Sequence, residues 1–298
     1  MRDALTAVLC AAIAVGACTL LVPNEASAAG LIERAHSQRL AASDLELGGD
    51  LQGAPAGTKR YLSRADLLTL PQVSYTVSDD SNFTGPTEIS GVLLEDLINA
   101  LAASDSDLVI AVCDDDYRAH YPRSYLTAHH PVLVLKINGQ DPEQWPKDAG
   151  EQGQAMGPYL ISHRQFTPSF KILSHADQSQ IPWGVVRLEF RNEKAVLEAI
   201  APAKRYAADS SVQAGYRIAQ QNCLRCHNAG QEGGLQAHHP WLVLSAWAAA
   251  SPEHFAKYVR FPKAENPNAQ MHPNPGYDDA TLAALTAYFR TFTSPEKP

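Results

Sequence analysis

Sulfur-containing residues are scarce in this chain. Only five of its 298 residues are cysteine, and three are methionine. A protein stapled by disulfides has more cysteines, in even number, so a disulfide framework is excluded. A basic excess is lacking as well, because the formal net charge is -8. This charge excludes a typical nucleic-acid binder, and no nucleic-acid partner is expected.

Long apolar runs are also rare. One lies near the N-terminus, where Arg2 precedes an apolar stretch over residues 4–22 and the small residues Ala26-Ser27-Ala28 follow it. This order predicts a signal peptide over residues 1–28 and an exported, periplasmic protein. No later segment reaches the ~20 apolar residues that are needed to cross a membrane.

The same N-terminal run allows a second interpretation. Val15-Gly16-Ala17-Cys18 resembles a lipoprotein cleavage box, and cleavage there would leave a lipid on Cys18. The apolar run continues past Cys18, which favours the ordinary signal peptide. Membrane attachment is therefore expected only if Cys18 is lipidated.

The remaining chain is long enough for two domains. Roughly 270 residues remain after cleavage, which is more than one typical domain needs. Residues 29–210 contain sixteen Lys and Arg against twenty-four Asp and Glu, whereas residues 211–298 contain seven against six. The acidic charge therefore belongs to the N-terminal domain. Residues 193–210, rich in alanine and charge, are expected to connect the two domains.

What the sequence does contain is one C-x-x-C-H pentapeptide, residues 223–227. Two thiols at this spacing, Cys223 and Cys226, reach the two vinyl groups of one haem, and His227 becomes the proximal ligand of the iron. The motif therefore predicts one covalently bound haem c. The alternative is a surface C-x-x-C-H string without haem, but the predicted export agrees with haem attachment.

Predicted helices flank the motif on both sides. Ser210-Ser211-Val212-Gln213 has the form of a capping box, and the helix that it opens ends at Cys223. Asp278 or Asp279 can cap a closing helix. Apolar residues recur at helical spacing in both helices: Val212, Gly215, Tyr216 and Ala219 in the first, and Leu282, Leu285, Phe289 and Phe292 in the last. A glycine in the first and the pair Tyr288-Phe289 in the last predict a close crossing.

With these elements in this order, residues 211–298 resemble a class I cytochrome c domain, which has an all-α fold. The resemblance implies that Met271, in a proline-bearing loop before the last helix, is the distal ligand of the haem iron. The family's usual proline after this methionine is replaced by His272, which is an alternative distal ligand. His238 and His239 are further candidates. Several aromatic residues are expected to line the haem pocket or an ordinary core: Trp241, Trp247, Phe255, Tyr258 and Phe261.

Residues 30–192 predict a different fold. One amphipathic helix is expected over residues 92–102, and Asn138-Gly139 signals a tight turn. Short apolar runs that are typical of strands recur at residues 73–77, 108–112, 132–137 and 183–190. These patterns predict a mixed, mainly β domain of the α+β class.

Six segments of this domain carry a family resemblance: residues 45–49, 62–71, 91–98, 116–117, 132–140 and 157–161. In this order they resemble the molybdopterin-binding domain of sulfite-oxidase-type enzymes. In that family, a cysteine thiolate between the second strand and the following helix holds molybdenum, and nearby basic residues bind the pterin phosphate.

The residues that this chemistry needs are missing from the matching interval. Residues 78–90 contain no Cys, Arg or Lys, and their three carboxylates would repel a phosphate. Bound molybdopterin is therefore not expected. Cys113, the only thiol of the domain, lies after the helix and is expected to be a small buried residue, with molybdenum ligation as the alternative.

Two polar clusters allow further sites. Asp114-Asp115-Asp116 follows a predicted strand, where a solvated turn is expected and a hard cation is the alternative. His120, His129 and His130 could join Asp116 in a transition-metal site if the fold brought them together.

The sequence thus predicts an exported mono-haem c-type cytochrome that exchanges single electrons with a periplasmic dehydrogenase or another redox protein. The N-terminal domain would act as a docking or scaffolding module. No catalytic residue is predicted, and the haem edge beside the C-x-x-C-H motif is the expected crossing point for electrons. One alternative is a molybdenum-pterin oxidoreductase with a fused cytochrome c as electron acceptor. Another is a haem sensor or peroxidase-like protein with a labile sixth ligand.

Overall fold

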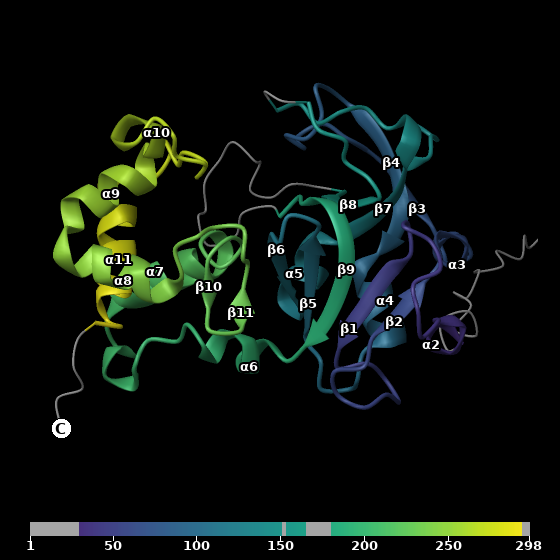
Figure 1. Ribbon diagram of the computed structural model, residues 1–298, viewed down its shortest axis with the longest axis horizontal. Coiled ribbons are helices and arrows are strands. Elements are labelled where there is room, and N and C mark those ends of the chain that lie inside the picture. The colour runs from purple at the N-terminus through teal and green to yellow at the C-terminus, as the bar shows by residue number, and fades with distance from the viewer. Residues whose placement is uncertain (1–29, 151–152, 165–179, 294–298) are drawn as a thin grey trace, which may run out of the picture.

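The computed structural model describes residues 30–150, 153–164 and 180–293. The predicted signal peptide and Cys18 lie outside the described residues. The chain has a sheet-rich N-terminal part, residues 30–191, and a helical C-terminal part, residues 210–293 (Figure 1). The predicted fold class, an α+β region followed by an all-α region, is confirmed. Among the described residues, no helix is long and apolar enough to cross a membrane.

One sheet organises the N-terminal part. Its strands are β1 (Leu45–Gly49), β2 (Arg60–Leu62), β3 (Val73–Val77), β4 (Thr87–Leu93), β5 (Leu108–Cys113), β6 (Arg118–Pro122), β7 (Pro131–Ile137), β8 (Tyr159–His163) and β9 (Trp183–Arg191). They run in the order β2-β1-β9-β8-β7-β4-β3, and β5 pairs with both β9 and β6. Strands β1 and β9 are parallel, so the two ends of the N-terminal part meet inside the sheet.

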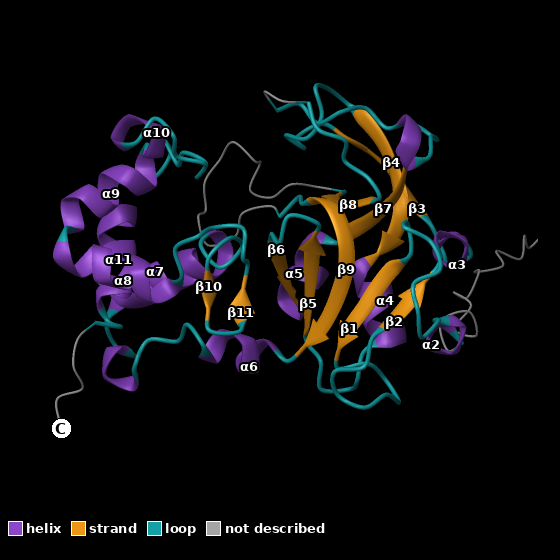
Figure 2. Cartoon of the chain, viewed as in Figure 1, coloured by secondary structure: helices purple, strands orange, loops and turns teal. Residues whose placement is uncertain are grey.

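Helices cover one face of this sheet (Figure 2). They are α2 (Leu31–Arg34), α3 (Arg64–Leu68), α4 (Leu94–Leu101) and α5 (Arg123–His129), and the 3-10 turn η1 (Pro142–Gln144) follows β7. The side chains of β5 alternate between the two faces of the sheet. Val109 and Ala111 lie in the core with α4 and α5, whereas Ile110 and Val112 contact Val196 on the opposite face. Burial on both faces explains why β5 is apolar throughout.

The four strands predicted from apolar runs are present as β3, β5, β7 and β9. The predicted helix over residues 92–102 is partly wrong, because Gly91, Val92 and Leu93 belong to β4 and α4 begins at Leu94. Pairing with β7 overrides the helical pattern here, since Val92 and Leu93 stand opposite Leu133 and Val132. The predicted turn after β7 is confirmed, because Asn138 and Gly139 both have positive φ, 50° and 72°.

The C-terminal part consists of helices and one small hairpin. Its elements are α7 (Ser210–Asn222), β10 (Asn228–Ala229), β11 (Glu232–Gly233), α8 (Trp241–Ala250), α9 (Pro252–Arg260), α10 (Pro262–Glu265) and α11 (Asp279–Arg290). Asp278 caps α11 by accepting a hydrogen bond from the Thr281 N–H, as predicted. The predicted capping box at Ser210 is wrong. The cap is Asp209, whose carboxylate accepts from the backbone of Ser211 and Val212, so Ser210 is already helical.

The stretch between the two parts packs on both of them. It contains α6 (Glu193–Glu198) and the 3-10 turn η2 (Lys204–Tyr206). Val196 packs against β5 on the face opposite α4 and α5, and Ile200 joins the core of the C-terminal part. The predicted connector is therefore an ordered packing element.

Helices α7 and α11 cross closely at Gly215, as the sequence predicts. The Tyr216 and Tyr288 rings stack beside this crossing, with centroids 5.7 Å apart. A Cβ atom on Gly215 would lie 2.6 Å from Tyr288 Cβ and closer still to the Ala284 carbonyl oxygen. Only a residue without a side chain permits this approach.

The crossing leads to a stability prediction. Gly215→Ala gains about 1 kcal/mol of helix propensity, but the added methyl forces the two helices apart, which costs about 1–3 kcal/mol or more. We therefore expect a net loss of unfolding free energy in denaturant titration. Gly85→Ala is the matched control, because nothing lies within 4 Å of its Cβ position. A Gly215→Ala variant at least as stable as wild type would contradict the close crossing.

Candidate haem site

The C-x-x-C-H motif begins at the C-terminal end of α7. Cys223 is the C-cap residue of this helix, and both Cys223 and Cys226 are free thiols. Burial raises the pKa of Cys223 to about 12 and that of Cys226 to about 11, so both are protonated at pH 7. A C-x-x-C pair that acts by thiol exchange needs a lowered thiol pKa. The local environment therefore disfavours a dithiol redox centre.

The ring of His227 has a fixed orientation. Its Nδ1–H donates a hydrogen bond to the His239 carbonyl oxygen at 2.6 Å, so Nε2 is the nitrogen available to a metal. Burial lowers the pKa of His227, although the bond to His239 opposes the shift. The ring is neutral at pH 7, which is the form that ligates iron.

The loop after β11 holds the motif from one side. The backbone N–H of Gly234 donates to the Leu224 carbonyl, and that of Ala237 donates to the Cys226 carbonyl, each at 2.9 Å. A Cβ atom on Gly234 would lie 2.9 Å from Cys226 Cα. Sequence reasoning did not identify this loop, because a glycine that is needed for close approach has no spacing pattern of its own.

An apolar cluster lies beside the motif. Trp241 and Phe255 are buried in it, as predicted, and Trp247 is partly buried, with its ring 4.9 Å from that of Tyr258. The prediction for Phe261 is wrong, because its side chain is 47% exposed after the end of α9. These rings make the surroundings of the motif largely apolar, which suits the face of a porphyrin.

The predicted distal ligands differ in their surroundings. Met271 is partly buried and packs against the same apolar cluster, whereas His272 is exposed. His238 and His239 are exposed as well. The site thus combines two free thiols, one oriented imidazole and one thioether near an apolar cluster. This donor set fits a c-type haem.

Comparison with known families agrees with this geometry. Residues 210–289 match the family model described as cytochrome C oxidase, cbb3-type, subunit III. These residues are a cytochrome c domain. A domain of this kind carries covalently bound haem c and serves electron transfer.

No curated protein matches the chain. Among solved structures, the crystal structure of the sulfane dehydrogenase SoxCD from Paracoccus pantotrophus is similar over 53% of this chain, with 12% sequence identity and a TM-score of 0.31. The chain covers 40% of that chain's length. The predicted sulfite-oxidase-type character of residues 30–192 stays a prediction.

The sequence-predicted sites of the N-terminal part are not brought together. Cys113 is buried at the end of β5, as expected for a small core residue. His120 is buried on β6, the ring of His129 lies 4.4 Å from that of Tyr125, and His130 pairs with Glu95. Across the described ranges, no three His, Cys, Asp or Glu side chains are grouped to hold a metal ion.

The acidic turn after β5, Asp114 to Asp116, has a contact that the sequence did not predict. Its side chains are exposed, but the turn also contacts the cytochrome c domain. The Asp116 carbonyl accepts from the Leu235 N–H at 3.1 Å, and the Asp115 carboxylate accepts from the Gln236 side chain. The turn is therefore exposed to solvent, as expected, and in addition it contacts the cytochrome c domain.

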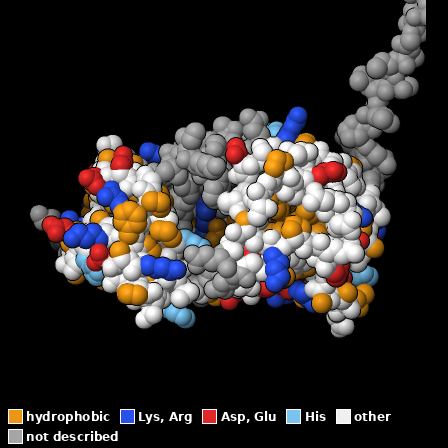
Figure 3. All heavy atoms as spheres, turned by 90° about the horizontal axis from the view of Figure 1, so that it is seen from above, with side chains coloured by type: hydrophobic (Ala, Val, Ile, Leu, Met, Phe, Trp, Pro, Cys, Tyr) orange, Lys and Arg blue, Asp and Glu red, His pale blue; other side chains and the backbone are white. Residues whose placement is uncertain are grey.

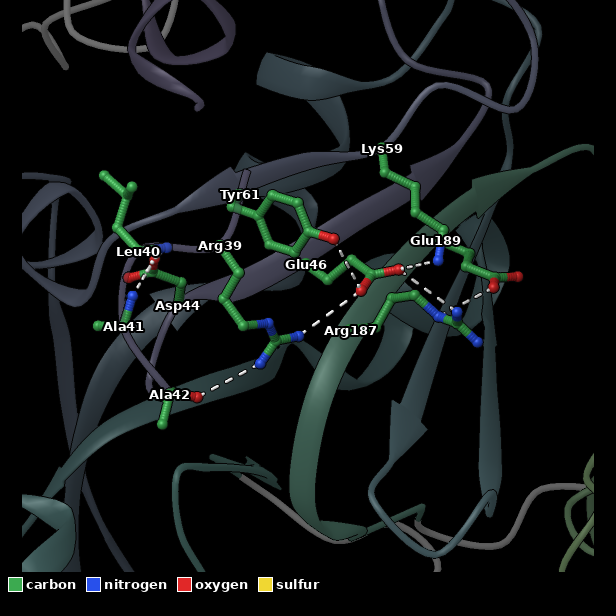
Figure 4. Close-up of polar contacts among 10 residues, drawn as sticks. All are labelled: Arg39, Leu40, Ala41, Ala42, Asp44, Glu46, Lys59, Tyr61, Arg187 and Glu189. Atoms are coloured by element: carbon green, nitrogen blue, oxygen red, sulfur yellow. Dashed lines mark hydrogen bonds and ion pairs between the residues drawn. The ribbon is translucent and has the colours of Figure 1, made fainter. Parts of the chain in front are cut away.

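A charged network lies around β1 and β9 (Figure 4), and it continues from Arg187 through Glu189 to Arg191. Glu46 on β1 lies at its centre and pairs with Lys59 at 2.9 Å and with Arg187 at 3.4 Å. Burial raises the pKa of Glu46, but Lys59 and Arg187 outweigh this effect and the net pKa is lowered. The charges of this cluster are paired with one another, so the cluster stabilises the sheet surface.

The segment between β3 and β4 contains a buried carboxyl group, that of Asp80. Asp80 accepts hydrogen bonds from the Ser162 hydroxyl at 2.6 Å and the Asn82 N–H at 2.9 Å. Burial raises its pKa from 3.8 to about 6, against the effect of these two bonds. The folded state therefore retains a proton on Asp80 between about pH 4 and pH 6 that the unfolded chain releases.

This shift predicts a pH effect on stability. The proton that Asp80 retains in the folded state adds about 3 kcal/mol to the unfolding free energy. This stabilisation is complete below pH 3.8 and is lost as the pH rises through about 6. Asp80→Asn is expected to remove this slope and to raise the unfolding free energy at pH 8. The exposed neighbour gives the control, Asp79→Asn. If the slopes of Asp80→Asn and wild type coincide between pH 4 and 6, Asp80 is not the responsible group.

Proposed function

We propose that this protein is an exported, mono-haem c-type cytochrome that passes single electrons to or from another redox protein. One observation carries the proposal: the imidazole of His227 is held by the His239 carbonyl, beside two free thiols at C-x-x-C spacing. Bound haem c supplies reversible one-electron exchange at its iron. The chain anchors the group through Cys223 and Cys226 and orients the proximal imidazole.

We assign the distal ligand to Met271. The partial burial of Met271 against the apolar cluster, compared with the exposure of His272, supports this assignment. A thioether ligand favours the reduced iron and raises the potential. If His227 and Met271 both ligate the iron, no position would remain for a substrate, so no catalytic residue is proposed.

The partner that we propose is a periplasmic dehydrogenase or another redox protein. Export rests on the signal-peptide pattern of residues 1–28. Large exposed hydrophobic side chains of the cytochrome c domain offer a contact surface: Leu242 is 70% exposed and Val243 is 42% exposed. Figure 3 shows hydrophobic side chains on one face of the cytochrome c domain, at the left of the view, and others over the N-terminal part.

Cofactor analysis of the purified protein tests the proposal. We expect one covalent haem per chain from the pyridine haemochrome spectrum and no molybdenum by elemental analysis. Molybdenum near one equivalent per chain would favour the fused molybdenum-pterin oxidoreductase instead. A reduced spectrum that changes on addition of carbon monoxide would favour a haem sensor or peroxidase-like protein.

A further inference from the structure

The turn between β5 and β6 lies on the haem-attachment motif itself. At its end, the Arg118 N–H donates to the Arg225 carbonyl at 2.9 Å. Arg225 stands between the two cysteines that bind the haem. From the same turn, Asp116 accepts the Leu235 N–H at 3.1 Å. In Figure 1, β10 and β11 of the cytochrome c domain lie between its helices and strands β5 and β6.

Side chains extend this contact in two directions. Arg191 at the end of β9 forms an ion pair with Glu232 on β11, with Nη2 and Oε1 2.7 Å apart. Gln180 donates to the Gln221 side chain near the end of α7 at 3.1 Å. The contact therefore surrounds the motif with polar bonds from three segments of the N-terminal part.

The turn is fixed within its own sheet. The Cys113 N–H bonds to the Tyr117 carbonyl at 2.9 Å, and the Asp114 N–H bonds to the Gly184 carbonyl at 2.9 Å. Asp116 adopts a left-handed conformation with φ of 67°, which aspartate tolerates better than most residues. A turn held in this way presents its carbonyl to Leu235 without further ordering.

We propose that the N-terminal part covers the haem-attachment edge of the cytochrome c domain and makes this edge unavailable to external redox partners. The inference rests on the proposed electron-transfer function, because Cys223 and Cys226, which flank Arg225, would hold the vinyl groups of the haem at this contact. It reverses the sequence expectation that electrons cross beside the motif. It also gives the N-terminal part a partner inside its own chain, and external proteins use another face of the cytochrome c domain.

Charge reversal in the full-length holoprotein tests the cover. Arg191→Glu and Glu232→Arg each place like charges together at the contact, and the double variant restores an opposite pair. Lys136→Glu is the control, since Lys136 lies on β7 and pairs with Asp141 within the N-terminal part. The probes are amide hydrogen exchange at Arg118 and Leu235 and the rate at which ferricyanide oxidises the reduced protein.

We expect both single variants to speed amide exchange at least tenfold and ferricyanide oxidation several-fold. The double variant should return both rates toward those of wild type, although residue 191 also lies beside Glu189, and Lys136→Glu should behave like wild type. The two single variants change the net charge in opposite directions. Acceleration in both therefore reports opening of the cover, whereas one faster and one slower variant reports long-range attraction of ferricyanide and would overturn the inference. Faster amide exchange with unchanged oxidation would overturn it as well.

A milder variant covers the case in which a reversed charge prevents folding. Asp115→Ala lies on the exposed turn and removes the contact with Gln236 without burying a charge. Like the single charge reversals, it is expected to speed both amide exchange and ferricyanide oxidation. Unchanged rates would again contradict the cover. A wild-type protein that carries no haem or is not reduced would instead contradict the proposed function.

Discussion

Replacing Cys223 and Cys226 together with alanine is expected to leave the protein without covalently attached haem. The two thioether bonds are the only covalent links that the motif offers, and no noncovalent ligand survives denaturation. Haem staining of the denatured chain on a gel, with the mass of the intact chain, measures the loss. We expect the loss to be complete.

The third described cysteine provides a matched control. Cys113 is free and buried at the end of β5, so Cys113→Ala removes a thiol of the same chemistry from the other part of the chain. It is expected to keep the full amount of covalent haem. Haem that stays bound to the denatured double variant would contradict the assignment of the motif.

The second large effect is expected at the distal ligand. Met271→Ala removes the proposed thioether, so the methionine charge-transfer band of the oxidised protein should disappear and the midpoint potential should fall. Axial ligands set haem potentials over a range of about 0.8 V, and we expect a sizeable fraction of that range. Visible spectroscopy and a redox titration measure both effects.

His272→Ala is the control for this substitution. The histidine is adjacent in sequence but exposed, and its loss should change neither the band nor the potential. The opposite pattern, with Met271→Ala silent and His272→Ala altering the spectrum, would assign the distal position to His272. Retention of the band in both variants would show that neither residue ligates iron.

Local patterns predicted much of the cytochrome c domain. The C-x-x-C-H motif, the apolar spacing of α7 and α11 and the glycine at their crossing are signals within one or two helical turns. The capping error moved the start of α7 by one residue, because Asp209 competes with Ser210 for the same role. Such alternatives differ little in local sequence and are decided by backbone geometry.

Contacts between distant segments were not predicted. The carbonyl of His239 that orients His227 belongs to the backbone, so no side-chain type signals it. The hydrogen bond between Arg118 and Arg225 joins residues more than one hundred positions apart and is likewise made by the backbone. The sequence could identify the acidic turn, but its place against the motif depends on how the two parts pack.

The number of electrons that one chain accepts tests the central claim most directly. In a coulometric titration of the purified protein, we expect one electron per chain in a single step that follows the one-electron Nernst slope of about 59 mV per tenfold change. The haem bands should report the same step. Two or more electrons per chain would reveal a second redox centre and would contradict a mono-haem carrier.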